Sequence, residues 1–396
     1  MIKKIVLQCI IICMFLFGFS GCAKEEPTTV TVPKENVFGI WFSYLDYQEV
    51  IGIVDEETFK TKVDEILDNM ESIGINTIYL HAVAFTDSFY ESNIYPRSKD
   101  VSSEYDPFKI WVEKAHARNI KVEAWINPFR SKLVGEEEEL SPTLQEWIKV
   151  NDERVRTVDG RYYLNPAYPE ISELICSVAQ ELIDKYKVDG IHLDDYFYPE
   201  NTKSKFDAYI YSEATEIMSI SREDFRRNAV NEIVENLYLT VKKKDKRLKF
   251  GISTAGNNDN NYNLYFADIS AWIEKGTIDY LIPQIYWGFN HPTKPFTTTF
   301  EEFKGLITNP NIALYAGLAA YKVGTQDQWA ASAVNEWVDN SDILTKEMEY
   351  TMQNGGQGVA YFRYASLFQP NAEVQGNVEK EIINIKTYMK SFHTEE

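Results

Sequence analysis

The chain alternates short runs of β-forming residues with segments of helical periodicity, and this alternation constrains the fold more than any other feature. Eight runs are predicted as strands, at residues 37–44, 76–83, 121–127, 190–196, 249–254, 279–287, 312–318 and 358–364. Each is followed by a segment with apolar residues at helical spacing, at 56–72, 107–118, 170–186, 222–244, 265–275, 299–307, 341–352 and 379–391. Repeated β-then-α units require a parallel sheet, and eight of them commonly close into a barrel. We therefore predict an α/β fold, a single parallel (β/α)8 TIM barrel. The competing doubly wound sheet is disfavoured because no glycine-rich phosphate-binding turn follows any strand.

Three of the connections that follow predicted strands are long, at residues 85–106, 128–169 and 197–221. Each leaves the carboxyl end of its strand, and in a barrel all such connections meet on one face. Residues that bind and transform substrates concentrate on loops held by a rigid scaffold. The sequence therefore predicts long βα loops and a functional site at the C-terminal face of the barrel.

The N-terminal residues have the pattern of a bacterial lipoprotein leader. Lys3 and Lys4 precede an apolar run at residues 5–19, which is too short to span a bilayer comfortably. The run ends in small residues directly before Cys22, the position at which a lipid is attached in such proteins. We predict that residues 1–21 are a lipoprotein signal peptide and that Cys22 is lipidated. The alternatives are an ordinary secretory signal and an uncleaved anchor.

Two further regions follow this leader. Residues 22–36 are predicted to form a flexible tether, and residues 37–396 the barrel. The expected location is extracytoplasmic, with the protein anchored by lipid to the bacterial cell membrane and touching the membrane only through the lipid on Cys22. The sequence leaves the oligomeric state open.

The formal net charge of −20 argues against nucleic acid or an anionic membrane surface as a partner. Aromatic residues make up 14% of the chain, with eight Trp and 25 Tyr. Sugar rings stack on such faces, so this composition is compatible with a polysaccharide partner, although most aromatic residues in any barrel belong to the core.

Polar and aromatic side chains recur on one phase near the ends of several predicted strands. Since side chains alternate along a strand, each phase faces either the barrel interior or the covering helices. The predicted interior phases are Tyr79 and His81; Glu123, Trp125 and Asn127; His192, Asp194 and Tyr196; Ile282, Gln284 and Tyr286; and Tyr361 and Arg363. A structural barrel would fill such positions with Val, Ile or Leu, so we interpret them as a site. A satisfied polar network inside a structural barrel is the alternative.

Asp194 and Asp195, at the end of the fourth predicted strand, are the candidate catalytic carboxylates. Glycosidic cleavage needs an acid for the leaving oxygen and a second carboxylate as base or nucleophile. Consecutive side chains on a strand diverge, so we assign the central role to Asp194, while Asp195 orients a neighbour, binds a hydroxyl or caps the next segment. The partner is Glu123, on the adjacent strand, or Asp87 beyond the second strand. No His or Cys spacing typical of a metal site is present, and no cofactor is expected.

Several longer stretches make the chain similar to the glycosyl hydrolase-like 10 family of bacterial envelope barrels. The matching segments include Tyr105-Asp106-Pro107, residues 124–130, Leu164-Asn165-Pro166, and residues 189–199, 225–231, 250–253, 279–287 and 358–364. The resemblance implies a barrel with glycosidase activity on the glycan strands of peptidoglycan. It also implies site roles for Asp194, Asp195, Trp125, Asn127, Arg130, Gln284, Tyr286 and Trp287. Glu123 stands where the family usually has His.

Residues 189–196 are also similar to a chitinase motif in which the last position is an acidic Glu, and here that position is Tyr196. From the interior phases and the family resemblance together, the candidate substrate-binding residues are Asp87, Trp125, Asn127, Arg130, His192, Tyr196, Gln284, Tyr286, Trp287 and Arg363. The leading hypothesis is a glycoside hydrolase that acts on a cell-envelope or extracellular polysaccharide. The main alternative is a non-catalytic glycan-binding lipoprotein that retains the barrel, and a third is a lyase or transglycosidase.

Overall fold

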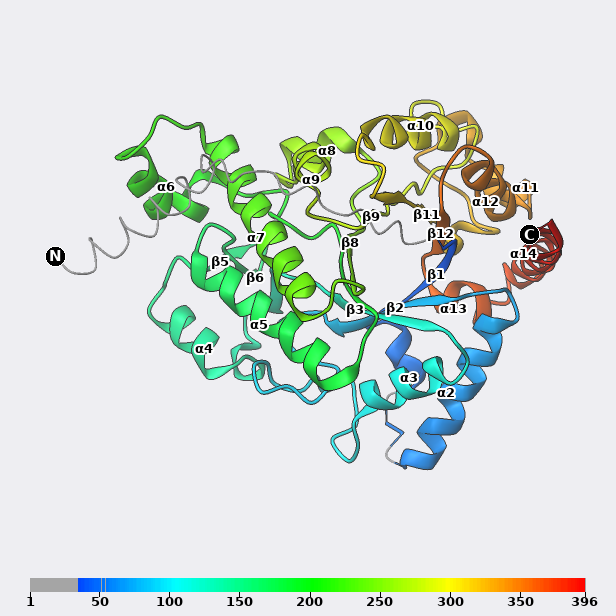
Figure 1. Ribbon diagram of the computed structural model, residues 1–396, viewed down its shortest axis with the longest axis horizontal. Helices are drawn as coiled ribbons and strands as arrows, with labels where there is room; N and C mark the ends of the chain where they lie inside the picture. The colour runs from blue at the N-terminus through cyan, green and yellow to red at the C-terminus, as the bar shows by residue number, and fades with distance from the viewer. Residues whose placement is uncertain (1–34, 51, 54, 396) are drawn as a thin grey trace.

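The computed structural model describes residues 35–50, 52–53 and 55–395, so the predicted leader, Cys22 and most of the predicted tether lie outside the described residues. A parallel sheet occupies the centre of the molecule (Figure 1). Its strands are β1 (Val37–Phe42), β2 (Thr77–Val83), β3 (Lys121–Ile126), β7 (Gly190–Leu193), β8 (Lys249–Ile252), β9 (Tyr280–Leu281), β10 (Ala313–Leu314), β11 (Ala316–Leu318) and β12 (Gly358–Tyr361). They lie in the order β10-β9-β8-β7-β3-β2-β1-β12-β11.

The sheet closes on itself because β10 and β11 are two stretches of one strand, interrupted at Tyr315. β10 pairs with β9 and β11 pairs with β12, in both cases parallel. The amide of Tyr315 donates a hydrogen bond to the carbonyl of Leu281, at 2.9 Å, across the interruption. Eight strand positions therefore form a complete ring, and the predicted (β/α)8 barrel is confirmed.

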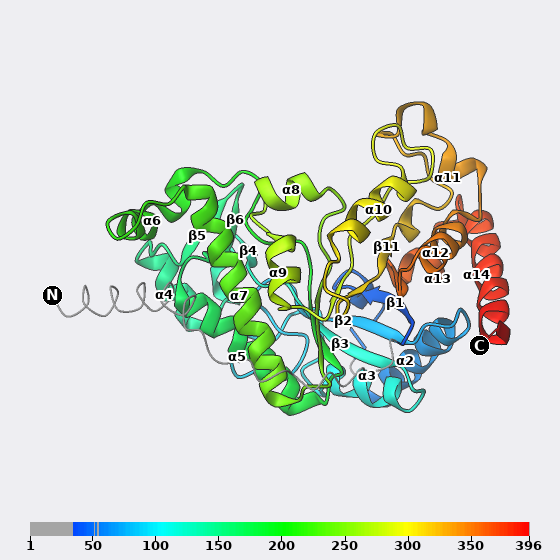
Figure 2. The same ribbon diagram turned by 45° about the horizontal axis from the view of Figure 1, so that its top comes forward.

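The covering helices also follow the predicted segments, with ends that differ by a few residues. They are α2 (Glu56–Glu71), α3 (Pro107–His116), α5 (Pro169–Tyr186), α7 (Arg222–Lys244), α9 (Ile269–Lys275), α10 (Phe296–Leu306), α12 (Ile343–Gln353) and α14 (Gln375–Glu395). Asp55 and Ser221 cap α2 and α7 through side-chain hydrogen bonds to the first turn. Figures 1 and 2 show the helices around the strands, with α5 and α7 side by side.

The long loop after β3 folds into a small antiparallel sheet that the sequence did not predict. Its strands are β4 (Arg130–Leu133), β5 (Val155–Val158) and β6 (Arg161–Leu164), in the order β4-β6-β5. Further short helices in the connections are α4 (Pro142–Lys149), α6 (Ala208–Thr215), α8 (Asn258–Asn263), α11 (Glu336–Asp339) and α13 (Tyr364–Phe368). Because β4 starts four residues after β3 ends, this sheet stands directly at the C-terminal face of the barrel.

The barrel interior is filled mainly by rings rather than by aliphatic side chains. The buried interior cluster contains Trp41, Tyr79, Trp125, Tyr280, Ile282, Tyr315 and Ala360. Strand register places His81, Trp125 and His192 side by side at one level, with Tyr79 and Glu123 one level below. The predicted interior phases of β2, β3 and β7 are thus confirmed. Glycines make room for this bulk: a Cβ on Gly251 would overlap the ring of Tyr280.

The predicted interior phase of the last strand is wrong. Ala360 and Phe362 face the interior cluster, whereas Tyr361 points outward and its hydroxyl contacts the Met348 sulfur on α12, at 3.3 Å. The indole of Trp41, on the neighbouring strand β1, fills the interior beside Phe362, with ring centroids 6.0 Å apart. A second bulky ring from position 361 has no space there, so the small Ala360 takes the inward place.

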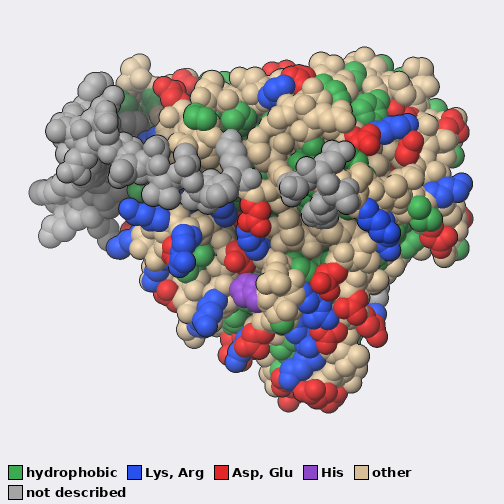
Figure 3. All heavy atoms as spheres, turned by 45° about the vertical axis from the view of Figure 1, so that its right-hand side comes forward, with side chains coloured by type: hydrophobic (Ala, Val, Ile, Leu, Met, Phe, Trp, Pro, Cys, Tyr) green, Lys and Arg blue, Asp and Glu red, His purple; other side chains and the backbone are tan. Residues whose placement is uncertain are grey.

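Figure 3 shows the molecule turned so that the right-hand side of Figure 1 comes forward. Acidic and basic side chains are interspersed on this face, so the excess negative charge forms no single patch there. Ion pairs form along and between helices, for example between Arg118 and Asp64 at 2.9 Å. Of the helices within the described ranges, none combines the length and the apolar character needed to cross a membrane.

The close packing around Gly251 leads to a stability prediction. Gly251→Ala should lower the free energy of unfolding by about 1–3 kcal/mol, because the added methyl group has to displace the buried Tyr280 ring. Gly305→Ala is the matched control: nothing lies near its Cβ position on α10, and the change should stabilise the protein by up to about 1 kcal/mol. Urea unfolding of both variants tests this, and equal midpoints would contradict it.

Candidate active site

A cavity of about 300 Å³ opens at the carboxyl ends of the barrel strands. Its lining is Trp41, Ser43, Tyr44, Leu45, His81, Trp125, Arg130, Asp194, Asp195, Tyr196, Ser253, Gln284, Tyr286, Tyr321 and Phe362. These residues come from almost every strand or from the loop that follows it, which is where barrel enzymes place their active sites. Two carboxylates and one guanidinium lie among mainly aromatic walls.

Asp194 is the more buried of the two carboxylates, with only 2% of its surface exposed. One oxygen accepts a hydrogen bond from Trp125 Nε1 at 3.0 Å, and the other accepts one from the backbone amide of Tyr196 at 3.2 Å. Burial, and then the negative charge of Asp195, raise the pKa of Asp194 to about 7, although Arg130 acts in the opposite direction. Asp194 therefore changes its protonation state near neutral pH.

Asp195 lines the same cavity, although side chains alternate on a regular strand. β7 ends at Leu193, so the backbone at the two aspartates is no longer extended and no longer sends neighbouring side chains to opposite faces. Burial raises the pKa of Asp195, while a hydrogen bond from the Gln284 side chain and the charge of Arg130 lower it. The structure thus brings together two carboxylates in different surroundings.

Arg130, the first residue of β4, forms one wall of the cavity. Its guanidinium carbon lies 3.9 Å from the centre of the Tyr196 ring and 4.6 Å from that of Phe85. Asn127 accepts a hydrogen bond from the backbone amide of Arg130, at 3.2 Å, and so fixes the turn that leads from β3 into β4. Asn127 itself is buried beneath this turn and does not line the cavity.

His81 forms part of the floor, stacked on Trp125 with ring centroids 3.8 Å apart. Its Nδ1 accepts a hydrogen bond from the backbone amide of Tyr44, at 3.2 Å, so its proton is on Nε2. Nε2 has no hydrogen-bond partner within the part of the chain that the structure describes. Burial and the nearby Arg130 lower the pKa of His81, so the ring is neutral.

Glu123 and His192 lie below the cavity in a chain of hydrogen bonds. Trp41 Nε1 donates to His192 Nε2 at 3.1 Å, His192 Nδ1 bonds the Tyr280 hydroxyl at 2.9 Å, and that hydroxyl donates to Glu123 at 2.5 Å. Burial raises the pKa of Glu123 to about 8 and lowers that of His192 to about 3. Neither residue lines the cavity, so both support its floor from inside the barrel.

Three further candidates from the sequence also lie outside the cavity lining. Asp87 is buried and forms an ion pair with Lys132, at 2.8 Å. Trp287 lies against the backbone of Gly256 and near His291, with ring centroids 5.9 Å apart. Arg363 lies two residues beyond the end of β12 and forms an ion pair with the buried Asp46, at 2.7 Å, which holds its side chain outside the cavity lining.

Sequence reasoning assigned no site role to several residues that line the cavity: Trp41, Ser43, Tyr44, Leu45, Ser253, Tyr321 and Phe362. Trp41 and Ser43 could have been predicted from the sequence. They occupy alternate positions on the first predicted strand, as Trp125 and Asn127 do on the third. Tyr321 and Leu45 lie in connections, where no periodicity indicates direction.

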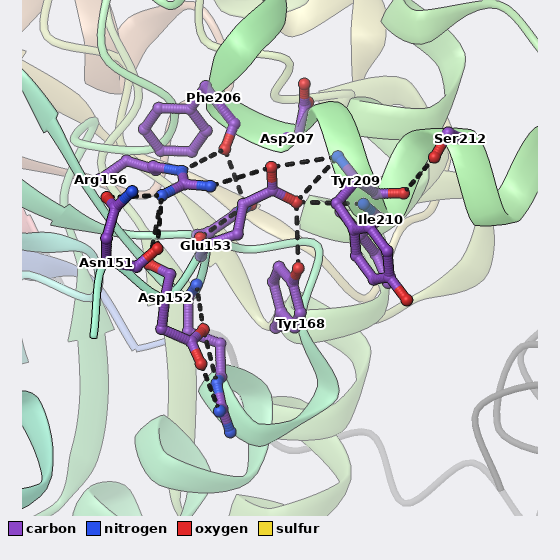
Figure 4. Close-up of polar contacts among 12 residues, drawn as sticks. Asn151, Asp152, Glu153, Arg156, Tyr168, Phe206, Asp207, Tyr209, Ile210 and Ser212 are labelled. Atoms are coloured by element: carbon purple, nitrogen blue, oxygen red, sulfur yellow. Dashed lines mark hydrogen bonds and ion pairs between the residues drawn. The ribbon is translucent and has the colours of Figure 1, made fainter. Parts of the chain in front are cut away.

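Glu153 ties the small antiparallel sheet to the helix α6, as Figure 4 shows. Its carboxylate accepts hydrogen bonds from Arg156 at 3.1 Å, from the Tyr168 hydroxyl at 3.0 Å, and from the amides of Tyr209 and Ile210, at 3.1 and 3.0 Å. These hydrogen bonds link the residues around Glu153 to the first turn of α6. Two long loops that are distant in sequence are thereby held as one unit beside the cavity.

The comparison with protein families decides the relationship. The sequence profile of the family described as glycosyl hydrolase-like 10 matches residues 36–335. The chain belongs to this family. Glycosyl hydrolase DigH from Escherichia coli K12 is 29% identical over 366 residues, covering 82% of each chain. Glycosyl hydrolase YngK from Bacillus subtilis is 28% identical over 329 residues, covering 77% of this chain and 64% of that protein.

Solved structures show the same fold in glycosidases. An α-L-fucosidase from Paenibacillus thiaminolyticus superimposes with a TM-score of 0.57 at 12% identity, covering 91% of this chain and 50% of the fucosidase. The C-terminal domain of a putative chitinase from Desulfitobacterium hafniense gives 0.53 at 10% identity, with 89% and 99% coverage. This glycosyl hydrolase-like 10 member thus shares its barrel architecture with glycosidases, and its cavity lies at the carboxyl ends of the barrel strands.

Among the described residues, no group of three or more His, Cys, Asp or Glu side chains is arranged to hold a metal ion. The chemical groups at the cavity are therefore carboxylates, a guanidinium, an amide, an imidazole and hydroxyls. Of these, the Asp194 carboxyl, with its pKa raised to about 7, is the group suited to exchanging protons near neutral pH.

The raised pKa of Asp194 predicts how stability depends on pH. Between the ordinary value of 3.8 and about 7, the unfolded chain releases this proton while the folded chain keeps it, so stability falls as the pH rises through this window. Asp194→Asn removes the loss. The variant should exceed the wild type in free energy of unfolding by roughly 1–3 kcal/mol at pH 8 and by little at pH 4. Thermal unfolding across this range is the measurement, and a difference independent of pH would refute the assignment.

Proposed function

We propose that this protein is a glycoside hydrolase whose proton chemistry is centred on Asp194. In its protonated form Asp194 gives its proton to the glycosidic oxygen as the bond to the anomeric carbon breaks. Asp195, as a carboxylate, faces the positive charge that develops on that carbon. Water then supplies the hydroxyl group of the new reducing end, and its remaining proton returns to the carboxylate pair.

One observation carries this proposal: two adjacent carboxylates line a single cavity, in surroundings that separate their roles. The Asp194 carboxyl is almost fully buried, and its pKa of about 7 lets it hold a proton at neutral pH. Asp195 is less buried and receives a hydrogen bond from Gln284, which favours its charged form. Glycosidic cleavage requires an acid and an ionised carboxylate that flank the bond to be broken, and a sugar bound in this cavity would have both within reach.

The walls of the cavity suit a sugar chain. Trp41, Tyr44, Tyr286, Tyr321 and Phe362 present ring faces and edges, and aromatic side chains combine apolar area with defined geometry. His81 adds an imidazole ring to the lining, and its buried Nε2–H has no partner among the described residues. These features support a polysaccharide as the ligand.

The substrate that we propose is the glycan strand of peptidoglycan. Membership of a glycosyl hydrolase-like family supports a glycan in general. The lipoprotein pattern that ends at Cys22 would place the enzyme outside the cytoplasm and anchor it by lipid to the cell membrane, within reach of the envelope. A short anchored tether would then restrict the barrel to polymers close to the membrane surface.

The test is product analysis by mass spectrometry. The barrel, from Val37 onward, is incubated with amidase-treated peptidoglycan strands, with chitin oligosaccharides and with plant glucans. We expect fragments that have gained water, and Asp194→Asn should lower their rate of formation about 10³-fold because the proton donor is lost. Turnover should also fall as the pH rises above about 7, where Asp194 loses its proton.

Asp245→Asn is the matched control. This residue lies between α7 and β8, at the opposite end of the barrel, and the change should leave turnover at the wild-type level. Unsaturated or anhydro products would indicate a lyase or transglycosidase instead. Binding of a glycan without any cleavage, unaltered in Asp194→Asn, would indicate a glycan-binding protein.

A further inference from the structure

Four basic residues belong to the small antiparallel sheet, and two of them form no close ion pair with a described residue. Lys132 pairs with Asp87 and Arg156 pairs with Glu153. Arg130 and Arg161 form no ion pair with any residue in the described ranges, and the Nε of Arg130 is buried without a hydrogen-bond partner. In a chain with 60 acidic and 40 basic residues, two unpaired guanidinium groups at one place need an explanation.

The two guanidinium groups lie on the same side of the sheet and on the same ring. Arg130 pairs across the strands with Tyr163, and Arg161 is two residues from Tyr163, so the three side chains share a face. The guanidinium carbons of Arg130 and Arg161 are 4.6 and 4.8 Å from the centre of the Phe85 ring. Phe85 packs in turn against Tyr44, which lines the cavity, with ring centroids 4.9 Å apart.

This placement costs free energy when no anion is present. Burial and the charge of Arg130 both lower the pKa of Arg161, so Arg130 disfavours the charged form of Arg161. Arg161 also donates to the Ser131 carbonyl at 2.6 Å, which holds it in position without compensating its charge. An anion bound between the two groups would relieve the repulsion, and planar guanidinium groups bind carboxylates through paired hydrogen bonds.

We propose that Arg130 and Arg161 form a subsite for a carboxylate carried by a sugar ring next to the bond that is cleaved. Arg130 lines the cavity beside both aspartates, so the subsite adjoins the reacting bond. The inference deepens the proposed function: it rests on a glycan substrate and specifies an acidic one. The free lactyl carboxylate of muramic acid in peptide-free peptidoglycan has this chemistry, and so has the carboxylate of a uronic acid. Chitin, which is neutral, lacks it.

Equilibrium binding tests the subsite separately from hydrolysis. Isothermal titration calorimetry on Asp194→Asn protein would compare three ligands: a peptide-free peptidoglycan tetrasaccharide, the same tetrasaccharide with its carboxyls converted to amides, and a uronic acid tetrasaccharide. We expect the free acid to bind at least tenfold more tightly than its amide, with a preference that weakens as salt is added. Arg161→Gln should reduce the preference to about onefold.

Arg247→Gln is the control for the loss of one positive charge. Arg247 is exposed, pairs with Asp245, and lies at the opposite end of the barrel, so the preference should persist. A role of Arg161 in holding β6 alone would alter stability without changing the ratio between acid and amide. Equal affinities in the wild type, or a ratio unchanged by Arg161→Gln, would overturn the subsite.

The outcomes for the subsite and for the proposed function are distinguishable. Cleavage of peptidoglycan strands without any preference for the free acid would overturn the subsite alone. A strong preference for the free acid without cleavage of any glycan would overturn the hydrolase and leave the subsite standing. Preference for the uronic acid ligand over the muramic one would support the subsite and redirect the substrate proposal away from peptidoglycan.

Discussion

The hydrogen bond from the Trp125 indole to Asp194 fixes a carboxyl group in a place that water hardly reaches, and the rest of the site depends on it. Trp125 holds this position because His81 stacks on it and because its strand is paired on both sides. Below it, a chain of hydrogen bonds runs from Trp41 through His192 and Tyr280 to Glu123. The rings of the interior therefore determine the electrostatics at its mouth, since burial is the largest cause of the raised Asp194 pKa.

The barrel was predictable from the sequence because its signal is repeated eight times. Parallel strands that are buried on both faces appear in the sequence as apolar runs, and in the helices between them apolar residues recur with a period near 3.6. Errors in the ends of single elements therefore did not alter the number of strands and helices predicted. Asp194 was predictable because it follows a strand in which polar and apolar residues alternate. Its neighbour was harder to assign, because the strand ends at Leu193 and the alternation that separates consecutive side chains ends with it.

The remaining parts depend on tertiary contacts that no local pattern records. Glu123 faces the barrel interior, as a site residue would. Alternation along a strand predicts this direction but not the level of a residue along the barrel axis, and the structure places Glu123 beneath the cavity. Arg363 was assigned to the wrong face because bulk and polarity at positions 361 and 363 suggested an interior role, whereas Trp41 already occupies that space. The antiparallel sheet has strands of four residues each, too short for a periodic signal.

The small sheet also divides the molecule's tasks between two sets of residues. Asp194 and Asp195 are fixed by barrel strands whose packing tolerates little change, whereas Arg130 and Arg161 belong to an insertion that is held by its own contacts, such as those of Glu153. A change in the insertion therefore alters contacts with the loops at the cavity, such as the Lys132–Asp87 ion pair, before it alters the packing between the barrel strands. Descendants of one ancestral barrel could in this way exchange the sugars they select while inheriting the same carboxylates unchanged.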